Sequence, residues 1–141
     1  MSDQPVLAIA EQLVERAKAA GATQADAVAM RTTNSDATVR LGGLEKVIEA
    51  TSLGVGVRVI VDGRQAVAST SDITETALDE TVAIVMELAS LAQPDAYAGL
   101  PDPGDQVKVP DALGLYDENI EMLTMHEQIE RALACEQAAL D

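Results

Sequence analysis

The clearest secondary-structure signal in this chain of 141 residues is the run Val55-Gly56-Val57-Arg58-Val59-Ile60-Val61-Asp62-Gly63-Arg64-Gln65-Ala66-Val67-Ala68-Ser69. Both halves of the run follow the period of two that is typical of strands. Between them stands Asp62-Gly63, which favours a two-residue type I′ turn because both positions tolerate a positive φ. The run therefore predicts an antiparallel hairpin of strands 55–61 and 64–69.

The same period of two extends upstream from this hairpin to Ala25. We expect three further strands there, 25–32, 37–41 and 44–51. Their boundaries are the turn-forming stretches Asn34-Ser35-Asp36 and Gly42-Gly43. Gly54 and Gly56 stand where a strand prefers side chains, so a bulge or a close backbone approach is expected at those positions. The sheet is thus expected to be an antiparallel meander of about five strands.

Helical periodicity flanks this sheet. Residues 6–20 carry an apolar stripe at helical spacing, with Pro5 suited to the start of a helix and Gly21 to its end. A last helix is expected to start at Thr124, because Glu127 three residues later completes a capping box. Its apolar face would contain Ile129, Ala132, Leu133 and Leu140.

A further helix is expected between the sheet and this last helix. Thr74 is a candidate N-cap, which would place Ile73 and Leu78 in a hydrophobic staple, and Asp72 with Glu75 is the alternative capping pair. We expect the helix to run to about Ala92. The residues expected to be buried are Leu78, Val82, Val85, either Leu88 or Ala89, and Ala92.

The predicted fold class is α+β, with an N-terminal helix, the meander, and two helices packed on one face of the sheet. A length of 141 residues fits one domain. Within it we distinguish residues 1–92 with helix, sheet and helix, a connection at 93–117 that holds four of the five prolines, and a terminal helix region at 118–141. The helical pattern continues to Asp141, so we expect the chain to be a fragment or its last helix to dock against something outside it.

Composition and charge limit the possible partners. The chain has no Phe or Trp and only Tyr97 and Tyr116 as aromatic residues, which excludes a base-stacking platform or an aromatic ligand cage. Its formal net charge of -15 opposes binding to nucleic acid or to an anionic membrane surface. No apolar run reaches the roughly 18 residues of a membrane span, and the N-terminus lacks the basic start of a signal peptide. A cytoplasmic location is expected.

Two residues are candidates for catalysis or metal binding, His126 and Cys135. His126-Glu127 resembles the start of a zinc-peptidase motif, but Glu130 and Arg131 stand where the second histidine would be required. We therefore expect His126 to lie on an exposed helix face. Cys135, the single cysteine, lacks the electropositive setting that activates a thiol, so it is expected to be a small packed core residue.

Three other stretches also have simple structural interpretations. The run 68–72, Ala-Ser-Thr-Ser-Asp, lacks the glycines and the lysine of a phosphate loop, and its side chains are expected to cap the following helix. The run 54–57, Gly-Val-Gly-Val, opens a strand, whereas a dinucleotide fingerprint connects a strand to a helix. Asp102, Asp105 and Asp111 match no calcium loop in their spacing and are expected to be solvated surface charges. No catalytic, cofactor-binding or metal-binding residue is therefore assigned.

Ordered short motifs nevertheless resemble one protein family. They are Ala19-Ala20-Gly21-Ala22, Ala25-Asp26-Ala27, Val39-Arg40, Gly43-Leu44-Glu45, Gly54-Val55-Gly56-Val57-Arg58-Val59, Asp62-Gly63-Arg64, Ala68-Ser69-Thr70-Ser71-Asp72, Gly99-Leu100-Pro101-Asp102, Leu113-Gly114-Leu115-Tyr116-Asp117 and Glu136-Gln137-Ala138-Ala139. Together they resemble the N-terminal domain of the TldD/PmbA family, whose older label is modulator of DNA gyrase. The Ser-Thr-Ser-Asp stretch at 69–72 favours its PmbA (TldE) branch.

This resemblance implies a role in proteolysis. TldD-like subunits carry a zinc-binding His-Glu-x-x-x-His helix beyond this domain, and PmbA-like subunits lack it and pair with TldD to enclose a chamber that processes peptides. It implies that this chain is a non-catalytic domain without its own zinc, with a TldD-like subunit or a second copy as partner and extended or unfolded peptides as substrates. No catalytic residue of the family maps onto a position of this chain.

Two other functions remain open on the sequence. One is a stand-alone acidic interaction module whose last helix lies in the groove of a partner. The other, a small hydrolase that uses Ser69 or Cys135, lacks a general base within plausible sequence reach.

Overall fold

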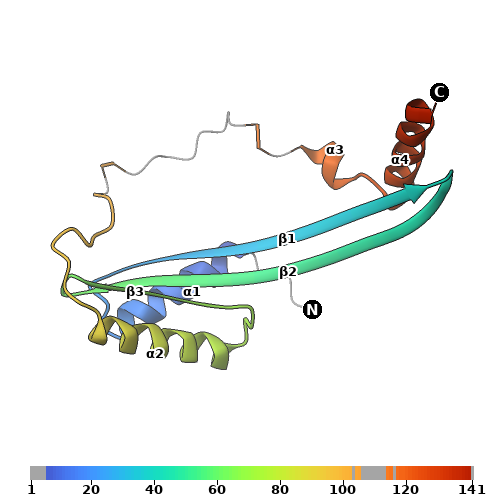
Figure 1. The fold of residues 1–141 in the computed structure, drawn as a ribbon. Helices are drawn as coiled ribbons and strands as arrows, with labels where there is room; N and C mark the ends of the chain where they lie inside the picture. Colours follow the sequence, from blue (N-terminus) through green and yellow to red (C-terminus); the bar gives the residue numbers. More distant parts are fainter. Residues whose placement is uncertain (1–5, 103, 106–113, 116, 141) are drawn as a thin grey trace. The chain divides into compact units, whose positions relative to one another are not determined.

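The computed structural model of the chain describes residues 6–102, 104–105, 114–115 and 117–140. Figure 1 shows an α+β fold. Its elements are α1 (Val6–Ala19), β1 (Gln24–Arg40), β2 (Gly43–Val61), β3 (Arg64–Thr70), α2 (Glu75–Leu91), α3 (Glu118–Glu121) and α4 (Met125–Leu140). The sheet has three antiparallel strands in the order β1-β2-β3. The predicted fold class is therefore confirmed.

The sheet has three strands, so the expected number of about five is wrong. The stretch Asn34-Ser35-Asp36 lies inside β1, and Gly54 lies inside β2. Pairing between the two long strands outweighs the local preference of these residues for turns. One sign of this pairing is the contact between the hydroxyl groups of Thr33 and Thr51, whose oxygens are 3.1 Å apart.

The predicted hairpin of β2 and β3 is confirmed. Asp62 has φ 49° and Gly63 has φ 74°, as a type I′ turn requires. The register runs without interruption from Val61 opposite Arg64 to Val55 opposite Thr70, so the bulge expected at Gly56 does not form against β3. The close backbone approach occurs instead at Gly63, whose carbonyl accepts a hydrogen bond from the Asp95 N–H at 2.7 Å.

The other hairpin turn lies one residue earlier than expected. Leu41 with φ 53° and Gly42 with φ 74° form the turn between β1 and β2, and β2 begins at Gly43. A leucine in the left-handed region is uncommon, because its Cβ crowds the neighbouring carbonyl oxygen. The sequence pattern placed the turn at Gly42-Gly43 because glycine is the usual residue there.

The residues fall into two compact units, each with its own contacts. Unit 1 comprises residues 1–32 and 52–106, and unit 2 comprises residues 33–51 and 107–141. Unit 1 has an aliphatic core between the sheet, α1 and α2. Its buried members are Ile9, Leu13, Ala17, Ala22, Ala25, Val55, Val57, Val59, Ala66, Leu78, Val82, Val85 and Ala89.

Helix α2 packs much as its periodicity predicts. Thr74 is the N-cap and its hydroxyl accepts the Ala77 N–H at 3.4 Å. Ala89 is buried and Leu88 is 46% exposed, which decides the alternative left open by the pattern. Thr81 is also buried. Its hydroxyl donates a hydrogen bond to the Ala77 carbonyl oxygen at 2.7 Å, so the buried hydroxyl has a partner.

Unit 2 combines the far part of the β1–β2 hairpin with α4. The predicted capping box of α4 is confirmed, since the Glu127 carboxylate accepts the Thr124 N–H at 2.8 Å and the Thr124 hydroxyl accepts the Glu127 N–H at 3.3 Å. No residue of α4 is buried, so this helix does not belong to the aliphatic core described above. In unit 1, α2 packs on the sheet as expected.

Candidate functional site

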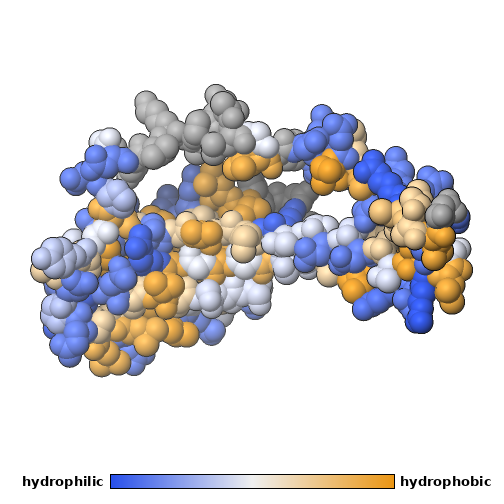
Figure 2. Space-filling model, turned by 45° about the horizontal axis from the view of Figure 1, so that its top comes forward, coloured by the Kyte–Doolittle hydropathy of each residue, from blue (hydrophilic) through white to orange (hydrophobic). Residues whose placement is uncertain are grey.

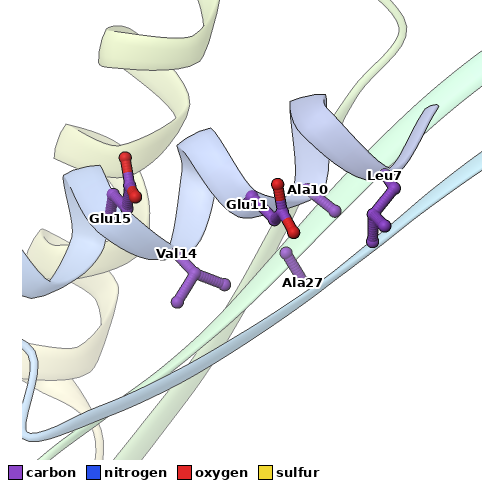
Figure 3. A pocket seen from close by; sticks show the side chains of 6 residues that line it. All are labelled: Leu7, Ala10, Glu11, Val14, Glu15 and Ala27. Atoms are coloured by element: carbon purple, nitrogen blue, oxygen red, sulfur yellow. The ribbon is translucent and has the colours of Figure 1, made fainter. Parts of the chain in front are cut away.

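An open hollow with a volume of about 510 Å³ lies on the flank of α1, beside β1, in unit 1. Figure 3 shows Leu7 and Val14 extending from α1 toward the strands, with Ala27 of β1 below the helix. Ala10 completes the apolar lining, and Glu11 and Glu15 provide two carboxylates on the same flank. The hollow is apolar at its base and negatively charged at its rim.

The hollow adjoins a free strand edge. In the described sheet β1 pairs with β2 alone, so its other side presents backbone N–H and C=O groups that pair with no further strand. Such an edge is a template for the addition of another extended segment. A free edge next to an apolar hollow is the feature of unit 1 best suited to binding.

Helix α1 is held in place by ion pairs to α2. The Arg16 guanidinium pairs with the carboxylates of Glu75 and Asp79 and donates to the Glu75 carbonyl oxygen at 3.1 Å. The hydrogen bond to the Glu75 side chain is the main cause that raises the pKa of Arg16 above its ordinary value. Glu11 and Glu15, on the same helix, line the hollow.

A second feature of unit 1 is a bidentate ion pair between β2 and β1. Arg58 donates from Nε to Asp26 Oδ1 and from Nη2 to Asp26 Oδ2, both at 2.8 Å. These hydrogen bonds are the main cause that raises the pKa of Arg58. Because Arg58 alternates with the buried Val57 and Val59, the pair lies on the sheet face away from the core.

Apolar side chains near this ion pair are also exposed. Val28, Met30 and Val67 are 60–68% exposed. Figure 2 shows hydrophobic surface beside strongly hydrophilic areas over the body at the left, which is unit 1. Val28, Met30 and Val67 do not line the hollow beside α1.

In unit 2 the tip of the long hairpin is bound by α4. The two carboxylate oxygens of Glu136 accept the N–H groups of Leu41 at 2.7 Å and Gly42 at 2.8 Å. The Ser35 hydroxyl donates to the Gln128 side-chain oxygen at 3.0 Å. These contacts are structural, because they satisfy backbone and side-chain groups of the hairpin itself.

The residues weighed as catalytic candidates do not come together. His126 lies on an exposed face of α4, as expected, with Nε2 3.3 Å from a carboxylate oxygen of Glu130. Cys135 is exposed, so its expected role as a packed core residue is wrong: α4 is too lightly covered to bury it. Within the described residues no group of three or more His, Cys, Asp or Glu side chains could hold a metal ion.

The expectation that the side chains of the run 68–72 cap the following helix is wrong, because the N-cap of α2 is Thr74 and the run makes the turn before it. Thr70 Oγ1 accepts the Asp72 N–H at 3.0 Å, and Asp72 Oδ1 accepts the Thr74 N–H at 2.9 Å. The backbone hydrogen bond from Thr74 is the main cause that lowers the pKa of Asp72. Asp72 thus stabilises the turn that precedes α2, and Thr74 caps the helix itself.

Among the described residues of the connection, the acidic side chains form no group that could hold a cation. The Asp102 carbonyl oxygen accepts the Asp105 N–H at 2.8 Å, and this hydrogen bond closes a turn of the backbone. Asp111 lies outside the described residues.

The hollow and the pair between Asp26 and Arg58 were not predicted from the sequence. The sequence does contain a signal for the ion pair, since opposite charges at outward positions of neighbouring strands often meet. It contains no signal for the hollow, because the hollow depends on how far α1 overlaps the sheet. Among the residues that the structure describes, no helix is long and apolar enough to cross a membrane.

The sheet and α2 of unit 1 are similar to known proteins. Residues 25–89 match the family described as PmbA/TldA metallopeptidase domain 1, whereas no curated protein sequence matches the chain. The fold is similar to TldE from Thermococcus kodakarensis, with a TM-score of 0.73 and 17% identity over 93% of this chain and 29% of that chain. It is also similar to a protein described as a putative modulator of DNA gyrase from Bacteroides thetaiotaomicron VPI-5482, with a TM-score of 0.80 and 23% identity over 94% of this chain and 30% of that chain. The chain spans less than a third of the length of either structure.

Proposed function

Because this chain carries the N-terminal domain of the TldD/PmbA family, we propose that it is a non-catalytic part of a PmbA/TldE-like subunit in a zinc metallopeptidase complex that degrades or processes peptides. The observation that carries this proposal is the family match over residues 25–89, which contain the sheet of unit 1 and most of α2. The choice of branch rests on the Ser-Thr-Ser-Asp stretch at 69–72.

A zinc centre does not fit the described residues of this chain. His126 and Glu130 are both well exposed, with relative side-chain exposures of 80% and 63%, and they pair with each other. The next residue, Arg131, is a cation where a ligand would be needed. We therefore assign no hydrolytic step to these residues, and we propose that the zinc belongs to a TldD-like partner.

The proposed role of this domain is to form part of the wall of a peptide-processing chamber. The free edge of β1 supports this role, because an extended peptide can add to such an edge through backbone hydrogen bonds that are independent of sequence. The net charge of -15 suits a wall that repels nucleic acid and other acidic chains.

The proposal is tested by co-expressing the chain with a TldD-type subunit that carries the zinc motif. We expect the two to copurify at a fixed ratio, and the isolated chain to contain no stoichiometric zinc by elemental analysis and to leave unfolded casein intact. Failure to copurify, together with a stable monomer, would favour the acidic interaction module. Casein cleavage by the isolated chain that survives rigorous purification would refute the assignment as non-catalytic.

A further inference from the structure

Within the residues that the structure describes, the sheet ends at β1 on one side and at β3 on the other, and these two edges differ in their surroundings. The β3 edge begins at Arg64, whose guanidinium donates to the carbonyl oxygens of Ser90 at 3.3 Å and Ala92 at 2.7 Å and so ties the start of β3 to the end of α2. The β1 edge lies beside the hollow under α1. Of these two edges, the β1 edge is therefore the one that combines unpaired backbone groups with space for side chains.

The hollow has the size and lining that an added strand needs. A neighbouring strand would lie about 4.8 Å from β1 and would point alternate side chains toward α1. Leu7, at 68% exposure, and Val14 would contact the inward side chains of that strand from above, and Ala27 would contact them from the side of β1. Burial of Leu7 would provide part of the driving force.

The charge of the lining specifies the side chains of the occupant. Glu11 and Glu15 are residues of α1, and within the part of the chain that the structure describes neither has an ion-pair partner. A lysine or arginine side chain that points inward could cover Leu7 and Val14 with its aliphatic part and bring its charged end to these carboxylates. The negative charge of the whole chain would attract the same peptides over longer distances.

We propose that the β1 edge over residues 24–30, together with the hollow lined by Leu7, Glu11, Val14, Glu15 and Ala27, is a binding site for an extended peptide with basic side chains at alternate positions. The peptide extends the sheet as a fourth strand next to β1. This inference rests on the proposed function for its class of ligand and adds to it a location and a preference for basic residues.

The test uses the full 141-residue chain and a fluorescein-labelled heptapeptide of alternating Thr and Lys. Fluorescence polarisation is measured for the wild type and for two double variants with the same change in net charge. Glu11→Lys with Glu15→Lys reverses the rim of the hollow, and Glu80→Lys with Glu87→Lys changes two exposed positions of α2. A second peptide with Glu in place of Lys serves as the ligand control.

We expect the rim variant to bind the lysine peptide at least tenfold more weakly than the α2 variant, and the wild type to discriminate against the glutamate peptide. In amide NMR spectra the peptide should shift the signals of residues 24–30 and leave those of β3 in place. An equal loss in both double variants would mean general attraction to an acidic protein and would overturn the proposal. Absence of binding, or shifts confined to β3, would overturn it as well.

Two more outcomes distinguish the peptide site from a dimer contact and from the proposed function. If sedimentation shows that the wild type is a dimer and the rim variant a monomer, the β1 edge belongs to a second copy and the proposed peptide site is wrong. The peptide assay needs neither zinc nor a TldD-type subunit. If the chain copurifies with that subunit but does not bind the peptide, only the peptide site is refuted. If the chain binds the peptide but forms no complex with the subunit, only the proposed function is refuted.

Discussion

The carboxylate of Glu136 in α4 holds the N–H of Leu41 at 2.7 Å, at a hairpin tip where Leu41 has a φ of 53°. The other carboxylate oxygen accepts the adjacent Gly42 N–H at 2.8 Å. Two consecutive donors thus point at one negative charge, and hydrogen bonds to an ionised acceptor are stronger than those between neutral groups. This contact compensates for an unfavourable backbone conformation and joins α4 to the hairpin within unit 2.

Replacement of Glu136 with Ala should therefore loosen the hairpin tip. Without an acceptor, the Leu41 and Gly42 amide protons lose their protection, so we expect their hydrogen exchange to become at least tenfold faster. Amide exchange followed by NMR measures this directly. Glu130→Ala is the matched control, because Glu130 lies on the same helix and contacts His126 instead of the tip. Equal exchange in the two variants would show that the Glu136 contact contributes nothing.

Leu41→Gly should stabilise the chain. Leu41 is 88% exposed, so the change removes little packing, and it relieves a left-handed conformation that costs a non-glycine residue about 1 kcal/mol. We expect the free energy of unfolding in urea to rise by up to about 1 kcal/mol, less the entropy that glycine adds to the unfolded chain. A decrease would mean that the Leu41 side chain makes a stabilising contact that outweighs its backbone strain.

The sequence predicted those features that depend on short-range chemistry. Thr74 and Thr124 start their helices, Asp62-Gly63 forms the type I′ turn, and the periodicity of α2 identifies its buried face. These outcomes depend on residues within one or two turns of each other, so a local pattern is sufficient to predict them.

Features that depend on distant residues could not be predicted. Asn34-Ser35-Asp36 favours a turn locally, but it becomes part of β1 because strand pairing with β2 extends through it. The turn with Leu41 in the left-handed region is supported by a carboxylate 95 positions further along the chain. The hollow under α1 is set by the packing of that helix on the sheet and on α2, which no local pattern encodes.

Acidification should weaken the start of α4. Hydrogen bonds from the side chain and backbone of Thr124 hold the pKa of Glu127 below its ordinary value of 4.5. Because the folded pKa is the lower one, this stabilisation is fully present above the unfolded pKa and is lost as the pH falls through the folded pKa. We expect the Thr124 amide signal to titrate with an apparent pKa below 4.5 in NMR spectra.

Glu127→Gln provides the control for this titration. Glutamine can also accept the Thr124 N–H, so the helix start should persist in the variant, but its dependence on pH should disappear. A Thr124 amide that still titrates in the same range in Glu127→Gln would assign the titration to another carboxylate.

The pair of Asp26 and Arg58 should show a measurable coupling energy. The two hydrogen bonds are well aligned and the side chains are only partly exposed, so we expect about 0.5–1 kcal/mol, near the upper end for ion pairs that remain accessible to solvent. A double-mutant cycle with Asp26→Ala, Arg58→Ala and the double variant measures this value from urea unfolding. The coupling should decrease in high salt, and a coupling of zero at low salt would mean that solvent screens the pair completely.

Adjacent positions of α2 should respond very differently to truncation. Val85 is 0% exposed within the aliphatic core, whereas Ile84 is 53% exposed. Val85→Ala removes two buried methyl groups and leaves a cavity, so we expect the free energy of unfolding to fall by about 2 kcal/mol. Ile84→Ala removes more atoms but from a solvated position, and alanine has the higher helix propensity, so we expect a change below about 0.5 kcal/mol. Urea unfolding followed by circular dichroism compares the two variants. If Ile84→Ala were the more destabilising change, the face of α2 assigned to the core would be wrong.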